Sequence, residues 1–272
     1  MLMRHQKKLP APALSAFVRH YWYFETDEAD IPFSQLSFPY GAFELICYLE
    51  NPNTMRWLDC DRSFLEPNIF YAGQLTKPFE LNFTQTCKCV GVSLYPWAGN
   101  LLYKIPASRF TNELIDLHNL EPEGGLFDQL QLCADSDALF SCLEAYMLKK
   151  LAGKQNDSLV SALARQIIDS PTRQNLKNTL CLSGLSRRRV EQRFIEATGL
   201  TMGLFTRKVR FQKTVHLLKN APKQSLTSLG ISAGYYDQSH FIADFKAFAG
   251  VSPKNFQQQK TSLSDILNIL VP

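Results

Sequence analysis

The feature that most constrains this chain is a pattern that occurs twice, 51 residues apart. Ser186 begins the first copy and Asp237 begins the second. In each copy a phenylalanine follows after eight residues and a glycine after five more, and another glycine lies two or three residues before the start. An internal repeat of this length indicates two copies of one supersecondary unit.

Each copy is typical of a helix-turn-helix unit. A tight turn between two helices favours glycine, because glycine adopts a positive φ without steric cost. Serine and aspartate cap the amino-terminal end of a helix, and a glycine commonly ends one. In these three roles the chain has Gly184, Ser186 and Gly199 in the first copy and Gly234, Asp237 and Gly250 in the second. The sequence therefore predicts two short helices, each preceded by a turn.

The solvent side of these helices carries side chains suited to DNA. Arginine and glutamine match the hydrogen-bonding edges of guanine and adenine in the major groove. A basic connecting helix is expected over residues 202–219, and it would hold the two units roughly 34 Å apart, about one turn of DNA. The predicted DNA-contacting residues are Ser186, Arg187, Arg188, Arg189, Gln192 and Arg193 in the first unit, Arg207 and Arg210 in the connecting helix, and Gln238, Ser239, His240, Ile242, Ala243 and Lys246 in the second unit. The second unit is less basic, so we expect it to bind more weakly or less specifically.

The distribution of charge supports a polyanionic partner. Residues 1–170 contain 14 Lys+Arg and 20 Asp+Glu, a balance of −6, whereas residues 171–260 contain 15 and 4, a balance of +11. Asp265 adds −1, and the three balances sum to the net charge of +4. A basic module on an acidic body predicts nucleic-acid binding, with a solvated basic face as the alternative.

The amino-terminal part has a different pattern. Short apolar stretches such as residues 43–49, 79–83 and 89–95 alternate with turn signals, which predicts a β-sandwich or small barrel. Apolar residues recur at helical spacing between Leu126 and Leu151, and residues 153–158 are polar. We therefore expect an α+β chain of two domains: a regulatory or dimerisation domain at 1–152, a linker at 153–158, an all-α DNA-binding domain at 159–260 and a tail at 261–272.

The double pattern resembles the AraC/XylS family of transcription regulators. The resemblance is strong over residues 176–256 and extends to the whole chain in layout. It is carried by Gly184-Leu185-Ser186, Arg193-Phe194, Thr198-Gly199, Arg210-Phe211, Leu217-Leu218, Gly234-Tyr235, Ser239-His240-Phe241, Phe245-Lys246, Gly250-Val251-Ser252-Pro253 and Phe256. The amino-terminal half is similar, more loosely, to a cupin-like domain through residues 38–46, Gly91-Val92 and residues 96–106. The resemblance implies a domain that senses a small effector, dimerises, or does both.

The chain departs from the family's pattern at a few positions. Thr179 and Leu180 stand where an apolar residue followed by a small one is usual, and Thr214 and Gly230 stand where alanine is common. Ala243 stands where a longer polar residue often faces DNA. These differences predict altered packing of the first unit and a second unit that mainly positions the protein on the phosphate backbone.

The sequence lacks signals for other classes of function. No two of the five histidines are close together, no phosphate-binding glycine loop or G-x-S-x-G turn occurs, and only Cys87 and Cys89 lie close enough to begin a metal site. We therefore predict no enzyme, no cofactor, no metal and no catalytic residue. An enzyme fused to a DNA-binding module is the distant alternative.

The expected protein is a bacterial cytoplasmic regulator without a membrane span. Its predicted partners are double-stranded promoter DNA, RNA polymerase, a small-molecule effector whose contacts the sequence does not assign, and a second copy of the chain. The alternative is a regulator without a ligand, controlled by a protein partner or by its own abundance. A cavity with convergent polar groups would favour the ligand, and a filled barrel would favour the alternative.

Overall fold

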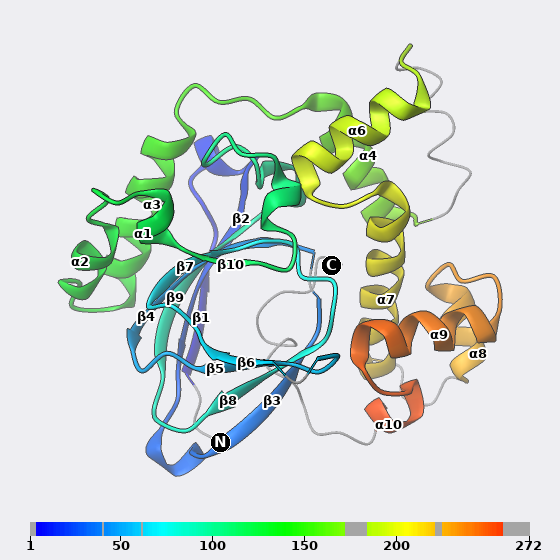
Figure 1. Cartoon of the computed structure of the whole chain (residues 1–272), viewed down its shortest axis with the longest axis horizontal. Coiled ribbons are helices and arrows are strands. Elements are labelled where there is room, and N and C mark those ends of the chain that lie inside the picture. The colour runs from blue at the N-terminus through cyan, green and yellow to red at the C-terminus, as the bar shows by residue number, and fades with distance from the viewer. Residues whose placement is uncertain (1–3, 40, 61, 172–183, 221–224, 258–272) are drawn as a thin grey trace.

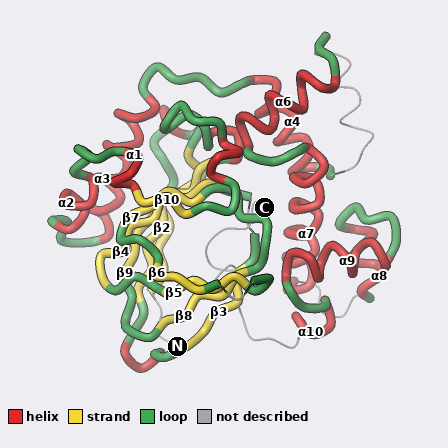
Figure 2. The backbone as a smooth tube through the Cα atoms, viewed as in Figure 1, coloured by secondary structure: helices red, strands yellow, loops and turns green. Residues whose placement is uncertain are grey.

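The computed structural model divides the chain into a β-rich part and a helical part that pack against each other (Figure 1). The described residues are 4–39, 41–60, 62–171, 184–220 and 225–257. Strands gather in the amino-terminal part, and helices follow one another in the carboxy-terminal part (Figure 2). The predicted α+β organisation of the chain is confirmed.

Two antiparallel sheets form the amino-terminal part. The larger sheet has the strand order β1-β2-β9-β4-β7-β10, and the smaller has the order β3-β8-β5-β6. The strands of the larger sheet are β1 (Arg4–Lys8), β2 (Val18–Glu25), β9 (Lys88–Leu94), β4 (Phe43–Glu50), β7 (Ile69–Ala72) and β10 (Leu114–Asp116). Those of the smaller are β3 (Phe33–Ser37), β8 (Phe79–Phe83), β5 (Thr54–Trp57) and β6 (Ser63–Leu65). In the described residues no ladder joins the two sheets, so the domain is a sandwich rather than a closed barrel.

The central strands of the larger sheet, β2, β9, β4 and β7, are buried on both faces. Along β2, Tyr21 and Tyr23 belong to the core that packs on helices, whereas Trp22 and Phe24 belong to the core between the sheets. This is why the strand reads as a continuous apolar run rather than an alternating one. The covering helices are α1 (Leu117–Leu120), α2 (Leu126–Gln131) and α3 (Ser136–Leu151), and the short 3-10 turns are η1 (Pro12–Leu14), η2 (Glu28–Asp30), η3 (Pro96–Ala98) and η4 (Ala107–Phe110).

The carboxy-terminal part is helical and has two small cores. Its elements are α4 (Ser158–Asp169), α6 (Arg187–Thr198), α7 (Met202–Asn220), α8 (Leu226–Ser232), α9 (Gln238–Ala249) and α10 (Pro253–Gln257). One core lies among α4, α6 and the start of α7, and the other lies among the end of α7, α8, α9 and α10. The helix α7 thus connects two compact units, as the repeat predicts.

Each helical core also includes an aromatic residue from the amino-terminal part. Trp97 of η3 packs in the first core, where Arg165 lies over its ring, and Phe38 packs in the second, edge-on to Phe211 and Phe256. The two parts therefore share apolar contacts at both ends of α7.

The polar stretch at 153–158 is more structured than its composition indicates. Asp157 caps α4, which already begins at Ser158, and its other carboxylate oxygen binds Arg193. Asn156 donates a hydrogen bond to the carbonyl of Ala16, and the Lys154 ammonium group donates to the carbonyl of Leu101. These side chains hold the segment to both parts of the molecule. Their residue types alone do not distinguish such a segment from a free linker.

The helices of the described residues include none that is long and apolar enough to cross a membrane. The predicted tail at 261–272 lies outside the described residues.

Candidate nucleic-acid interface

The turn and caps of α6 have the geometry that the sequence predicts. Gly184 has a φ of 66°, and the Ser186 hydroxyl accepts a hydrogen bond from the backbone N–H of Arg189. The helix ends at Gly199, whose φ of 80° places it in the left-handed region. Val190 and Phe194 are buried on the inner face, which fixes the opposite face toward solvent.

The exposed first turn of α6 is the strongest candidate for base contact. Arg187, Arg188, Arg189 and Gln192 are all exposed, and the three arginine side chains make no hydrogen bond or ion pair with any described residue. Gln192 donates a hydrogen bond to Glu196, one turn along the helix. Arg193 differs from these residues, because it is bound to Asp157 at 2.7 Å and is half-buried.

The second unit repeats this local structure in α9. Gly234 has a φ of 94°, Asp237 accepts a hydrogen bond from the backbone N–H of His240, and Gly250 ends the helix with a φ of 71°. The predicted contact residues Gln238, Ser239, His240, Ala243 and Lys246 are exposed, and Ile242 is partly buried. The exposed face of α9 therefore carries one lysine where that of α6 carries three arginines.

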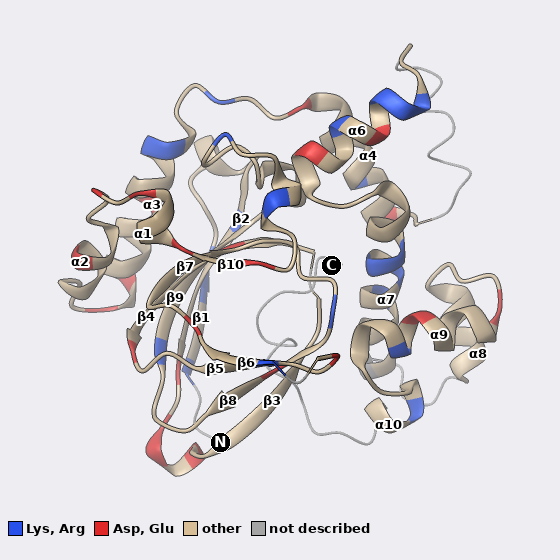
Figure 3. Cartoon of the chain, viewed as in Figure 1, with Lys and Arg blue, Asp and Glu red and all other residues tan. Residues whose placement is uncertain are grey.

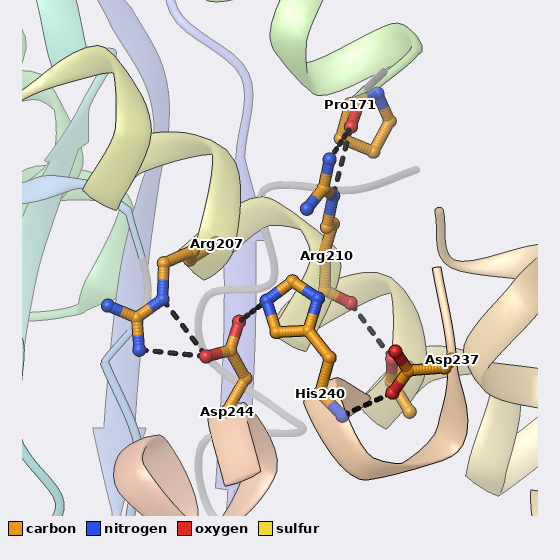
Figure 4. Close-up of polar contacts among 7 residues, drawn as sticks. Pro171, Arg207, Arg210, Asp237, His240 and Asp244 are labelled. Atoms are coloured by element: carbon orange, nitrogen blue, oxygen red, sulfur yellow. Dashed lines mark hydrogen bonds and ion pairs between the residues drawn. The ribbon is translucent and has the colours of Figure 1, made fainter. Parts of the chain in front are cut away.

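Several basic side chains of α7 bind other residues of the protein, although the Arg207 side chain remains 44% exposed. Arg207 donates two hydrogen bonds to Asp244 of α9, and Arg210 donates two to the carbonyl of Pro171 (Figure 4). This pairing raises the pKa of Arg207. Lys213 donates to the carbonyl of Asp169. The two predicted contacts on α7, Arg207 and Arg210, thus bind neighbouring elements and hold α9 and the end of α4 to α7.

The charged residues are distributed unevenly over the fold. Figure 3 shows basic residues at the outer end of α6, away from the sheets, and along α7, while acidic residues are spread over the amino-terminal part. Arg207, Arg210 and Lys213 of α7 bind Asp244, Pro171 and Asp169, whereas the three exposed arginines in the first turn of α6 make no such contact with the described residues. The structure places Arg187, Arg188, Arg189 and Gln192 on the exposed side of the first two turns of α6, and it binds Arg193 to Asp157, Arg207 to Asp244 and Arg210 to the carbonyl of Pro171.

Two of the departures from the family pattern have a local explanation. A Cβ on Gly230 would lie 3.1 Å from the ring of Phe241, closer than ordinary van der Waals contact, so the glycine leaves room for this ring. The buried hydroxyl of Thr214 donates to the carbonyl of Arg210 in its own helix. Thr179 and Leu180 lie outside the described residues, so the predicted change in packing of the first unit stays a prediction.

A narrow cavity lies between the two sheets of the amino-terminal part. Its volume is about 60 Å³. Its walls are mostly apolar and aromatic and include two buried glutamates, Glu44 and Glu66. The sequence predicts a sensor domain, but it does not distinguish these glutamates from surface residues.

One wall of this cavity contacts the helix between the two units. Gly73 and Leu75 line the cavity. The fully buried Lys208 of α7 donates hydrogen bonds to the side-chain oxygen of Gln74 at 2.7 Å and to the carbonyl of Leu75 at 2.8 Å. Burial lowers the pKa of Lys208 to about 7. The sequence counts Lys208 only among the basic residues of α7, because no local pattern reveals a partner 134 residues away.

The paired cysteines Cys87 and Cys89 are free and buried beside the cavity, and burial raises the pKa of Cys89. Among the residues that the structure describes, no three His, Cys, Asp or Glu side chains gather as metal ligands.

Two family models match the chain. Residues 182–259 match a model described as a helix-turn-helix domain. Residues 6–116 match a model described as a domain of unknown function (DUF6597).

The chain is similar to known regulators over part of its length. It is 29% identical over 104 residues to the HTH-type transcriptional regulator MtrA of Neisseria gonorrhoeae, which covers 38% of this chain and 34% of MtrA. It is 26% identical over 133 residues to an uncharacterised HTH-type transcriptional regulator of Haemophilus influenzae, which covers 45% of this chain and 44% of that protein. The chain thus spans between about a third and under half of the length of these relatives.

Among solved structures, the chain is similar to ToxT of Vibrio cholerae, with 10% identity, a TM-score of 0.48 and coverage of 93% of this chain and 98% of ToxT.

Proposed function

We propose that the protein is a sequence-specific DNA-binding transcription regulator of the AraC type, because residues 182–259 match a helix-turn-helix family model. One observation carries the proposal: the first two turns of α6 present Arg187, Arg188, Arg189 and Gln192 to solvent beside a capped helix end. In helix-turn-helix proteins the amino-terminal residues of the second helix contact base edges. The proposed partners are double-stranded DNA, RNA polymerase and a second copy of the chain.

The two units have different roles in this proposal. The unit that contains α6 reads the sequence, because it presents three arginines and a glutamine, the side chains that suit base edges, on an exposed face. The unit that contains α9 positions the protein on the phosphate backbone through Lys246 and the small polar residues at its exposed start. The internal ion pair between Arg207 and Asp244 sets the angle of α9 on α7.

A small molecule in the amino-terminal cavity is the proposed effector. The cavity has convergent polar groups, which favours the ligand-responsive protein over the ligand-independent alternative. The segment from Gly73 to Leu75 lines the cavity and also accepts the Lys208 hydrogen bonds. A ligand that displaces this segment would change the position of α7 and, with it, the spacing of α6 and α9.

The DNA-binding proposal is tested by selecting sequences from a random duplex library with the full chain. Selected sites should bind much more tightly than scrambled ones, and affinity should fall steeply with added salt because phosphate neutralisation releases counterions. Arg188→Ala and Gln192→Ala should each weaken the selected site by about 1–3 kcal/mol and relax the sequence preference.

The matched control for these variants is Arg62→Ala, which removes an exposed arginine from the amino-terminal part. It should leave the preference unchanged. If the selection enriches no sequence, or if both α6 variants keep the full sequence preference, the proposal that α6 recognises the DNA sequence is contradicted.

A further inference from the structure

We propose that the cavity between the sheets binds an organic ammonium ion with a slender apolar body. The cationic head of this ligand pairs with Glu66. Glu44, elsewhere on the cavity wall, accepts a hydrogen bond from a second donor group of the ligand. The inference specifies the chemical class of the proposed effector. The effect of this ligand on DNA binding rests on the proposed function.

No cationic side chain of the described residues pairs with the buried carboxyl group of Glu66. Its side-chain oxygen accepts a hydrogen bond from the Tyr48 hydroxyl, which in turn accepts one from Asn53 at 3.1 Å. The partners in this chain are neutral, and burial raises the pKa of Glu66 to about 7. A cation placed against this carboxyl group would supply the missing counterion and favour its ionised form.

Glu44 adds an open acceptor on the same cavity. It is 2% exposed, and one of its oxygens accepts a hydrogen bond from the Trp22 indole at 2.9 Å, while the other has no hydrogen-bond partner of good geometry. Arg19, Lys7 and Ser93 favour its charged form, yet burial dominates and raises the pKa of Glu44 to about 7. A buried acceptor without a donor is costly, so a ligand donor here gains affinity.

The remaining walls suit the body of such a ligand. The lining residues include no lysine, arginine or histidine. Aromatic rings attract cations through their electron-rich faces and also bury apolar chains. The rings on the cavity walls belong to Trp22, Phe24, Tyr48, Phe70, Phe79 and Phe83. The small reachable space favours a thin molecule over a bulky one.

Three compounds of similar length that differ in the charge of their head group test the ligand class on the full chain. They are n-hexylammonium, 1-hexanol and hexanoate, and their binding is compared by calorimetric titration at pH 7. Hexylammonium should bind roughly tenfold or more tightly than hexanol, since hydrogen bonds to a charged partner exceed neutral ones by this order. Hexanoate should bind most weakly, because two carboxyl groups face it. Equal binding of amine and alcohol, tighter binding of hexanoate, or no binding of hexylammonium would overturn the proposal.

Glu66→Gln assigns the selectivity to its residue. The amide keeps the size and can still accept from Tyr48, so the variant should bind hexylammonium and hexanol alike. Glu123→Gln, which changes an exposed glutamate outside the cavity, should keep the preference of the original chain. Retained selectivity in a folded Glu66→Gln protein would contradict the assignment, and the three-compound comparison stands if that variant does not fold.

DNA binding measured on the same preparations separates this inference from the proposed function. Loss of sequence preference without any compound contradicts the regulator, whatever the ligand result. Sequence-specific binding together with no preference for the ammonium ion contradicts only the ligand class. Tight ammonium binding that leaves DNA affinity unchanged contradicts the effector role.

Discussion

Glu66 gives the stability of this protein a defined dependence on pH. Its pKa is raised to about 7 in the folded chain from an ordinary value of 4.5. Between these values the folded protein keeps a proton that the unfolded chain has lost, so the free energy of unfolding falls as pH rises from about 4.5 to about 7.

Glu66→Gln should remove this contribution. As pH rises from 4 to 8, the free energy of unfolding of the variant should increase by roughly 2–3 kcal/mol relative to that of the original chain. Urea denaturation at both pH values measures the difference, with Glu123→Gln as the control. Parallel stability curves for the original chain and Glu66→Gln would show that the carboxyl group titrates normally.

For single residues, the sequence predicts roles that depend on chain neighbours better than it predicts contacts with residues far along the chain. The capping by Ser186 and Asp237 and the positive φ at the repeated glycines are confirmed, because such roles depend on neighbours a few residues away. The DNA contacts expected at Arg207 and Arg210 stay a prediction, and the structure adds partners that the sequence does not predict, Asp244 and the carbonyl of Pro171. Helical spacing gives the face of a side chain but not the partner 37 residues further on.

At the scale of the elements, the turn that follows α6 fixes the position of this helix against η4. Gly199 has a φ of 80°, and a Cβ there would lie 2.8 Å from the Thr111 hydroxyl and 2.9 Å from the Ala107 carbonyl of η4. Gly199→Ala should therefore cost about 2 kcal/mol or more, from left-handed strain and from this contact.

The matched change is Gly203→Ala in the first turn of α7, where the new methyl group meets only open space and the oxygen of Thr201 at 4.0 Å. This variant should be as stable as the original chain or more stable by up to about 1 kcal/mol. Thermal unfolding of both proteins compares the two positions, and equal losses would mean that the contact with η4 does not hold α6.

The molecule as a whole depends on contacts that the sequence pattern does not contain. Periodicity and composition predict a β-rich part and a helical part, and both are confirmed. The packing of Trp97 and Phe38 into the helical cores and the Lys208 contact join residues far apart in the chain, which leave no periodic signal. The predicted domain boundaries stay a prediction.

Lys208→Met should uncouple the two parts of the molecule. Methionine fills a similar volume but leaves the oxygens of Gln74 and Leu75 without their donor, which costs about 1–3 kcal/mol of contact between the parts. Limited proteolysis should then cleave the 153–157 segment several-fold faster. Lys149→Met, at an exposed position on α3, should not change the rate, and equal rates in all three proteins would contradict this coupling.

The central claim is that α6 and α9 bind one face of the same duplex. Hydroxyl-radical footprinting of the full chain on a selected site tests it most directly. We predict two protected stretches centred about 10–10.5 base pairs apart on one face, the usual separation of paired helix-turn-helix units. Arg188→Ala should weaken the protection of one stretch first. A single protected stretch, or uniform protection along the fragment, would contradict the claim.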